Sequence, residues 1–172
     1  MGTRSTDVNI ADKYDRTPLW IAADNFNVSK LLLDHGADAN IHDIDHQTPL
    51  YRAACRGHLD VSKLLVDHEA DVNIAGRYHQ TPLCIAAKKG NLDISKLLLD
   101  NGADPNIPDN DNWTPLYISA ERGHLDLCKL LVDNGANVNI PKHQTHLDLE
   151  LFKFLVDQEH VPSEDIIHHS HY

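Results

Sequence analysis

The chain has 172 residues, 41% hydrophobic and 24% charged, a composition typical of a folded domain rather than a disordered chain. Its 26 acidic and 15 basic residues give a net charge of −11, which opposes binding to nucleic acid or to an anionic membrane surface. The sequence has no secretory leader and no apolar run of the ~18 residues that span a membrane. We therefore expect a soluble, cytoplasmic protein, with the nucleus left open.

The first predicted unit, residues 11–40, contains Thr-Pro-Leu from Thr17 and closes with Ala-Asp-x-Asn from Ala37. A threonine hydroxyl caps helix N-termini, and proline suits the first helical turn, so a short helix should begin there. Later units place a glycine-containing pair between their two helices, whereas here Asp24-Asn25 runs directly into Phe26. The first unit should therefore lack the inter-helix turn pair.

Three further units follow at a spacing of 33, residues 41–73, 74–106 and 107–139. Each contains Thr-Pro-Leu, from Thr48, Thr81 and Thr114, which opens a small-residue helix that a glycine such as Gly57 ends. Apolar residues at helical spacing then predict a second helix, starting at Leu59 in the second unit. Neighbouring units must stack, because a helix pair this small cannot bury its apolar surface alone.

Several positions depart from the repeat. Glu69 replaces the glycine that follows the other second helices, and it should weaken that helix end by about 1 kcal/mol. Arg52 takes the place of an isoleucine and should either extend out of the interface or mark a local binding feature. The residues two before each Thr-Pro-Leu are of types that tolerate a left-handed backbone. They are Asp15, His46, His79 and Asn112.

The last unit, residues 140–158, lacks a first helix and is predicted to be a degenerate end cap. Its residues Leu147 and Leu151 begin one apolar stripe, and Leu149 and Phe152 begin another. One stripe can pack on the fourth unit, and the other is left for the tail at 159–172 or for a second molecule. We expect a monomer, with a dimer through this cap as the alternative.

Three segments resemble the ankyrin repeat family: TPLYRAACRGHLDVSKLLVDHEADVN (48–73), TPLCIAAKKGNLDISKLLLDNGADPN (81–106) and TPLYISAERGHLDLCKLLVDNGANVN (114–139). A 33-residue period carrying this motif is typical of that family. The resemblance implies an all-α solenoid of stacked helix-turn-helix units with protruding β-hairpin loops. We expect one such domain over residues 1–158.

The resemblance also implies a function. Ankyrin repeats bind other proteins, so we expect a non-catalytic protein-protein interaction module, without a cofactor, that binds a partner along the concave face. That face is formed by the hairpin tips and the first helices. The alternative is the regulatory or targeting arm of a larger enzyme, a channel or a ubiquitin-ligase adaptor. The fold does not identify the partner.

Tyrosine, tryptophan and arginine often anchor protein interfaces, and the tips carry several of them. Basic residues also recur at the ends of the first helices, on an otherwise acidic chain. The predicted partner-binding residues are Tyr14, Arg16, Arg56, Tyr78, Lys88, Lys89, Trp113 and Arg122. The aromatic residues directly after Thr-Pro-Leu, where the family usually has histidine, are instead expected to pack between repeats. They are Trp20, Tyr51 and Tyr117.

No nucleophile-base set or phosphate-binding loop stands outside the repeat, so no catalytic residue is predicted. The three cysteines lack metal or CxxC spacing and should be packed or half-exposed thiols. The 13 histidines, including the pair His42 and His46 and the terminal group at 168–171, do not predict a metal site, because a site needs fixed geometry and supporting residues.

The asparagines that close the Ala-Asp-x-Asn blocks bridge the loop backbone in the family, and an asparaginyl hydroxylase modifies some of them. A leucine lies eight residues ahead of each, as that enzyme prefers. By resemblance, the candidate hydroxylation sites are Asn40, Asn73, Asn106 and Asn139.

Overall fold

The computed structural model describes residues 7–138, nearly all of which lie in one compact unit that ends at Asn137. The predicted cap at 140–158 and the tail at 159–172 lie outside the described residues. The elements in chain order are α1 (Pro18–Ile21), α2 (Phe26–Asp34), α3 (Pro49–Arg56), α4 (Leu59–Asp67), η1 (Arg77–His79), α5 (Pro82–Lys89), α6 (Leu92–Asp100), α7 (Pro115–Glu121) and α8 (Leu125–Asp133).

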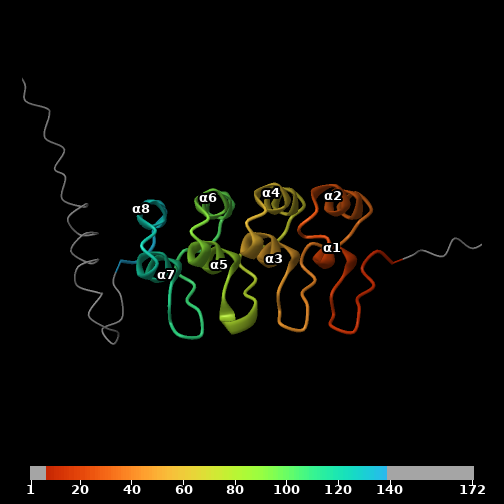
Figure 1. The fold of residues 1–172 in the computed structure, drawn as a ribbon, viewed down its shortest axis with the longest axis horizontal. Coiled ribbons are helices and arrows are strands. Elements are labelled where there is room, and N and C mark those ends of the chain that lie inside the picture. Colours follow the sequence, from red (N-terminus) through yellow and green to blue (C-terminus); the bar gives the residue numbers. More distant parts are fainter. Residues whose placement is uncertain (1–6, 139–172) are drawn as a thin grey trace, which may run out of the picture. The chain divides into compact units, whose positions relative to one another are not determined.

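The helices of this unit form two layers (Figure 1). The first helices α1, α3, α5 and α7 make one layer, and the second helices α2, α4, α6 and α8 make the other. Each helix contacts its partner in the same repeat and its equivalent in the next repeat. The predicted all-α solenoid is confirmed. The protruding loops contain no strand within residues 7–138, although backbone hydrogen bonds close their tips.

Threonine hydroxyls start the first helices, as the sequence predicts. The backbone N–H three residues on donates to the threonine Oγ1 at 3.1 Å in Thr17, 3.2 Å in Thr48 and Thr81, and 3.3 Å in Thr114. These caps satisfy amide groups that the helix leaves unpaired. Left-handed glycines, Gly57 at φ +79° and Gly90 at φ +70°, follow α3 and α5.

The buried core residues recur at equivalent positions of successive repeats. The leucine of each Thr-Pro-Leu is at most 1% exposed, and the alanines later in α3 and α5 are fully buried. Because alanine is small, neighbouring backbones approach closely, and each fully buried leucine contributes about 1.5–3 kcal/mol. The fully buried leucines of the two layers include Leu19, Leu50, Leu65, Leu83, Leu98 and Leu131.

The first repeat lacks the turn pair that the other repeats have, as predicted. Helix α1 is only four residues long, and Asn25 both follows it closely and caps α2, accepting the N–H of Val28 at 3.1 Å. In α4, α6 and α8, by contrast, no side-chain hydrogen bond caps the helix. A side-chain cap thus replaces the missing turn.

Asparagine side chains join successive loops into a ladder. Asn73 accepts the N–H of Asp104 at 2.9 Å and donates to the carbonyl of Gly102 at 3.1 Å. Asn40 and Asn106 make the equivalent pairs of bonds to the next repeat. Each amide therefore fixes the position of one loop against the next.

The ladder begins earlier than the Ala-Asp-x-Asn blocks indicate. Asn9 accepts the N–H of Asp38 at 2.9 Å, the bond that Asn40 makes one repeat later. The sequence analysis missed this member, although residues 7–10 read Asp-Val-Asn-Ile, as do residues 71–74. The spacing across the bond is 29 residues for Asn9 and 31 for the others, because the first repeat is two residues shorter.

Glu69 has a left-handed backbone, with φ +62°, at the position where Gly36 and Gly102 have +83° and +85°. A side chain is strained in this region by roughly 1 kcal/mol, and a carboxylate at a helix C-terminus opposes the helix dipole. We predict that Glu69→Gly raises the free energy of unfolding by about 1 kcal/mol in a urea titration.

The reciprocal change provides the control. Gly102 occupies the same place in the next repeat, and nothing lies within 4 Å of a Cβ built there, so Gly102→Glu adds strain without a clash. It should lower the free energy of unfolding by a similar amount. Equal stability of the two variants would show that backbone strain does not govern this position.

Candidate functional site

The loops that precede each Thr-Pro-Leu, residues 11–16, 42–47, 75–80 and 108–113, extend from the first layer, away from the second layer, and are called fingers here (Figure 1). An aspartate shapes three of them. In the fourth finger the Asp109 Oδ1 accepts the N–H groups of Asp111 and Trp113, both at 3.0 Å, and a buried carboxylate is thereby satisfied. Asp12 and Asp43 do the same in the first and second fingers.

The predicted left-handed residues are found near the ends of the fingers. Asp15, His46, His79 and Asn112 have φ between +57° and +64°, where the sequence placed them. Each sits just before the finger returns to the first helix. The finger conformation thus follows from an aspartate at one end and a left-handed residue at the other.

The third finger is different because Gly76 stands where the other fingers have aspartate. Without that carboxylate the finger folds into the 3-10 helix η1, and Tyr78 also takes a left-handed φ of +61°. A Cβ on Gly76 would lie 3.1 Å from the ring of Tyr51, so the glycine leaves room for that buried ring. The sequence analysis missed this turn. The result is that Tyr78 is 58% exposed.

A small groove lies between the fourth finger and the first helices α5 and α7. Trp113 is half-buried at its edge, with its ring centroid 5.0 Å from that of Tyr117. Three of the predicted partner-binding residues, Lys88, Trp113 and Arg122, meet in this groove. The sequence analysis did not identify the other lining residues, which are Gln80, Asp109, Asp111, Ile118 and Glu121.

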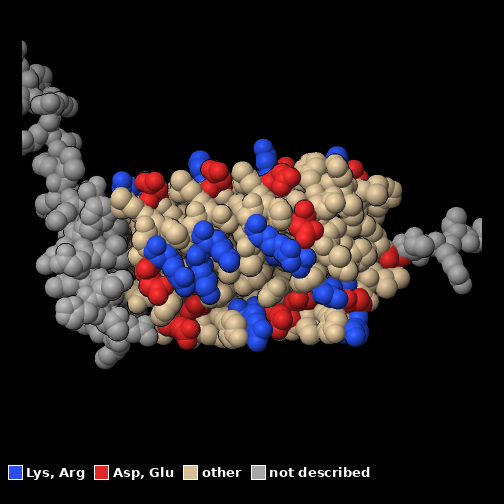
Figure 2. All heavy atoms as spheres, viewed as in Figure 1, with Lys and Arg blue, Asp and Glu red and all other residues tan. Residues whose placement is uncertain are grey.

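Basic residues run across the ends of the first helices, and the set Arg56, Lys88, Lys89 and Arg122 is called the basic row here. Figure 2 shows lysine and arginine gathered across α3, α5 and α7, with acidic residues towards the fingers. Arg122 lies 3.2 Å from Glu121. Within the described part of the chain, no carboxylate lies within ion-pair distance, 4.0 Å, of Lys88 or Lys89.

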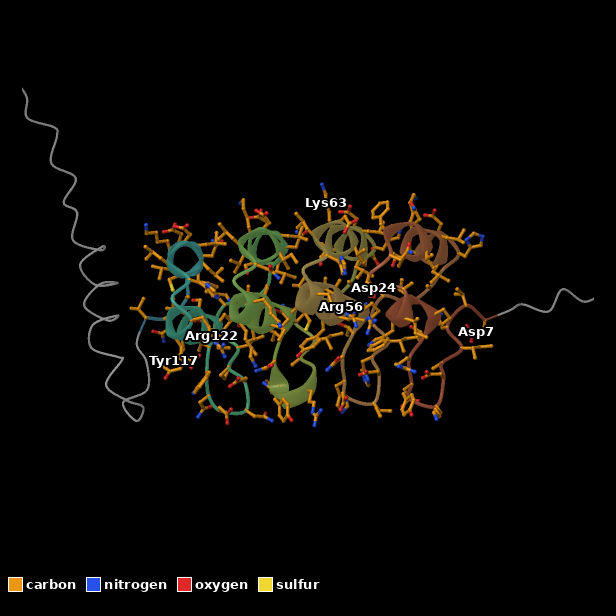
Figure 3. The ribbon with its side chains drawn as sticks, in the orientation of Figure 1. Asp7, Asp24, Arg56, Lys63, Tyr117 and Arg122 are labelled. Carbon is orange, nitrogen blue, oxygen red and sulfur yellow. The ribbon has the colours of Figure 1, made fainter. Side chains whose placement is uncertain are left out.

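Asp24 neutralises the other end of this row (Figure 3). Its Oδ2 lies 3.3 Å from Arg56 Nη1 and 3.4 Å from Arg52 Nη2, across the junction of the first two repeats. Arg52 also stacks on Trp20, with its guanidinium carbon 4.3 Å from the ring centroid. Burial lowers the pKa of Arg52. Arg52 is therefore held inside the molecule by an ion pair and a ring.

The first finger holds Arg16 in a similar way. Its guanidinium donates to Asp12 Oδ2 at 2.6 and 2.9 Å and lies 4.8 Å from the ring of Tyr14. Tyr14 is 42% exposed, but neither residue lines the groove. The structure thus places these two predicted partner-binding residues in a separate cluster at the first repeat.

The aromatic residues expected to pack between repeats are largely buried. Trp20 is 7% exposed and donates its Nε1–H to the carbonyl of Gln47 at 2.8 Å, in the next finger. Tyr51 is 5% exposed, and burial raises its pKa to about 12. Cys84 takes the same position in the third repeat and lies 3.6 Å from the carbonyl of Ile107. Tyr117 is half-buried beside the groove.

None of the described cysteines or histidines lines the groove. Burial raises the pKa of both Cys84 and Cys128, which disfavours the thiolate that a nucleophile needs, and Cys55 is half-buried. The rings of His42 and His46 lie 4.7 Å apart. Among residues 7–138 no group of three potential ligands is arranged around a metal position. The histidines at 168–171 lie outside the described residues.

The candidate hydroxylation sites Asn40, Asn73 and Asn106 all belong to the ladder, where both amide atoms are bonded to the next loop. Asn139 lies outside the described residues. Hydroxylation of these asparagines stays a prediction.

Comparison with known proteins agrees with the stacked helix pairs. A family model described as ankyrin repeats (3 copies) matches residues 3–76 and 73–142, which is well over half of the chain. The chain belongs to the ankyrin repeat family, whose members are generally non-catalytic protein-protein interaction modules. No helix of the described part combines the length and the apolar character needed to cross a bilayer.

A curated relative is similar over a shorter stretch. A putative ankyrin repeat protein of Rickettsia bellii is 41% identical over 49 residues. The match covers 27% of this chain and 29% of that protein, so it spans less than a third of the relative's length.

The Asp12–Arg16 pair makes a prediction that NMR can check. The hydrogen bond from the Arg16 side chain lowers the pKa of Asp12 from 3.8 to about 2. Because the folded pKa is the lower one, the pair stabilises the fold above pH 3.8 and ceases to do so as the pH falls through about 2. We expect the Asp12 carboxyl carbon to titrate near 2, and Arg16→Gln to return it towards 3.8.

Asp24→Asn is the matched control, because it removes a carboxylate from another pair and should leave the pKa of Asp12 unchanged. A normal Asp12 pKa in the unaltered protein would mean that Arg16 is not engaged and is available to a partner.

Proposed function

We propose that this protein binds a partner protein along the groove between the fingers and the first helices, centred on α5, α7 and the fourth finger. The single observation behind the proposal is that Lys88, Trp113 and Arg122 meet at one hollow. Exposed Tyr78 adds an aromatic side chain on the adjacent finger, and its carbonyl accepts the N–H of Asn110 at 2.9 Å. Aromatic and basic side chains beside a hollow are typical of binding hot spots.

The surrounding framework favours recognition rather than catalysis. The fingers are held by backbone bonds to aspartate and by the asparagine ladder, so a partner meets a largely preformed surface. The groove contains no buried nucleophile beside a base among the residues that line it. Preformed surfaces lose little conformational entropy on binding, which suits a protein-protein interface.

A regulatory or targeting arm of a larger enzyme, a channel or a ubiquitin-ligase adaptor is the alternative role. The same groove would then connect a further activity to its target. The length of the natural open reading frame around these 172 residues distinguishes the two roles.

Affinity capture from the source cell tests the proposal. We expect Tyr78→Asn with Trp113→Ala to reduce capture of the partner at least tenfold, because two hot-spot side chains are lost. Asparagine tolerates the left-handed backbone at residue 78, so the finger keeps its path. Circular dichroism and the melting temperature report whether the fold survives.

A second groove variant and a control variant complete the test. Lys88→Glu with Arg122→Glu changes only exposed residues of the same groove and should also abolish capture. Leu31→Ser changes a residue of α2 in the other layer that is 57% exposed, and it should leave capture intact. Undiminished capture by both groove variants would place the interface elsewhere.

A further inference from the structure

The basic row is neutralised unevenly along its length. At the α1–α3 junction the Asp24 carboxylate lies between Arg52 and Arg56 at 3.3–3.4 Å. At α5, Lys88 and Lys89 are both exposed, and among the described residues neither has a carboxylate within 4.0 Å. The basic row therefore has a carboxylate paired with Arg56 at one end, whereas the ammonium groups of Lys88 and Lys89 in its middle have no carboxylate partner among the described residues.

Asp24 is in this position because of its place in the repeat. It is the seventh residue after the threonine of Thr-Pro-Leu, and the same count gives Cys55, Lys88 and Glu121 in later repeats. In the third repeat that position is basic and lines the groove. The carboxylate that the first repeat supplies from its own chain is thus replaced by a cation where the groove is open.

We propose that a partner supplies the missing carboxylates: the groove binds an acidic peptide segment, whose carboxylates pair with Lys88, which lines the groove, and with its chain neighbour Lys89, as Asp24 pairs with Arg56. This inference rests on the proposed function and adds the chemistry of the partner. Charge-assisted bonds of this kind fix the register of the bound segment and raise its association rate.

The opposite wall of the groove limits how acidic the segment is. Asp111 and Glu121 line the groove facing the same hollow, so a continuous polyanion such as a nucleic acid strand meets repulsion there. Stacked first helices lie about 8–10 Å apart, and three residues of an extended polyproline II chain span about 9 Å. A segment with an acidic residue at every third position therefore brings one carboxylate to Lys88 and Lys89 at the end of α5 and the next ones to the ends of α3 and α7.

Fluorescence anisotropy with a designed peptide tests this inference. The probe is a fluorescein-labelled peptide of four Glu-Pro-Ala units, and its control has glutamine for each glutamate. We expect the 172-residue chain to bind the glutamate peptide at least tenfold more tightly than the glutamine peptide, with binding weakened by added salt.

Three variants locate the site. Lys88→Gln with Lys89→Gln should weaken binding of the glutamate peptide about tenfold, while Lys63→Gln with Lys129→Gln makes the same change of net charge on α4 and α8 and should not. Asp24→Asn removes the internal carboxylate and leaves Arg52 and Arg56 for the peptide, so it should tighten binding about threefold. Thermal melts confirm that each variant is folded.

The outcomes separate this inference from the proposed function. Equal binding of the two peptides, no measurable binding of either, or equal effects of the two lysine pairs would overturn the acidic-segment inference. If Tyr78→Asn with Trp113→Ala still abolishes partner capture in that case, the groove is the interface but its ligand is not acidic. If capture is unaffected by both groove variants and the glutamate peptide nevertheless binds at Lys88 and Lys89, the proposed function fails at that surface and the carboxylate site stands.

Discussion

Each repeat can bury its apolar face only against the next repeat, and this constraint governs the rest of the structure. The first helix has seven or eight residues in repeats two to four, too few to enclose a core alone. Leucines at equivalent positions, such as Leu50 and Leu83, are therefore fully buried between copies rather than within one. Because both helix layers stack in register, every finger leaves the same side of the stack, and the fingers form one continuous row.

Polar groups keep that register at the loops. The bond from Asn9 spans 29 residues and the bond from Asn40 spans 31, yet both connect equivalent atoms of successive loops. The ladder thus continues across the first repeat, although that repeat is two residues shorter than the others. Positions outside the core and the ladder are free to differ, and the variation at Gly76 changes the shape of one finger without disturbing the stack. Such positions vary from repeat to repeat, and the proposed binding residues lie among them.

The charges show how local variation becomes specificity. The molecule is acidic as a whole, yet the ends of its first helices form a basic row, which also suits the helix C-termini. Asp24 of the first repeat forms ion pairs with Arg52 and Arg56. No carboxylate of the described chain forms such a pair with Lys88 or Lys89 of the third repeat. The same scaffold position thus forms a structural ion pair in one copy and is the proposed binding element in another.

The family could be predicted from the 33-residue period of the motif. The helix pairs, the caps at the four Thr-Pro-Leu motifs and the left-handed residues of the fingers could also be predicted, because they depend on residues that are close together in the chain. Only the packed structure shows which of the predicted binding residues lie together. Arg16, a predicted partner-binding residue, is bonded to Asp12, whereas Lys88, Trp113 and Arg122 share a groove with Asp109 and Ile118, which were not predicted to bind. The ring of Tyr51 lies against Gly76 and explains why a glycine occupies that position. These contacts depend on distances between residues of different repeats. The sequence gives the type of each residue, but it does not show which other side chain lies against it.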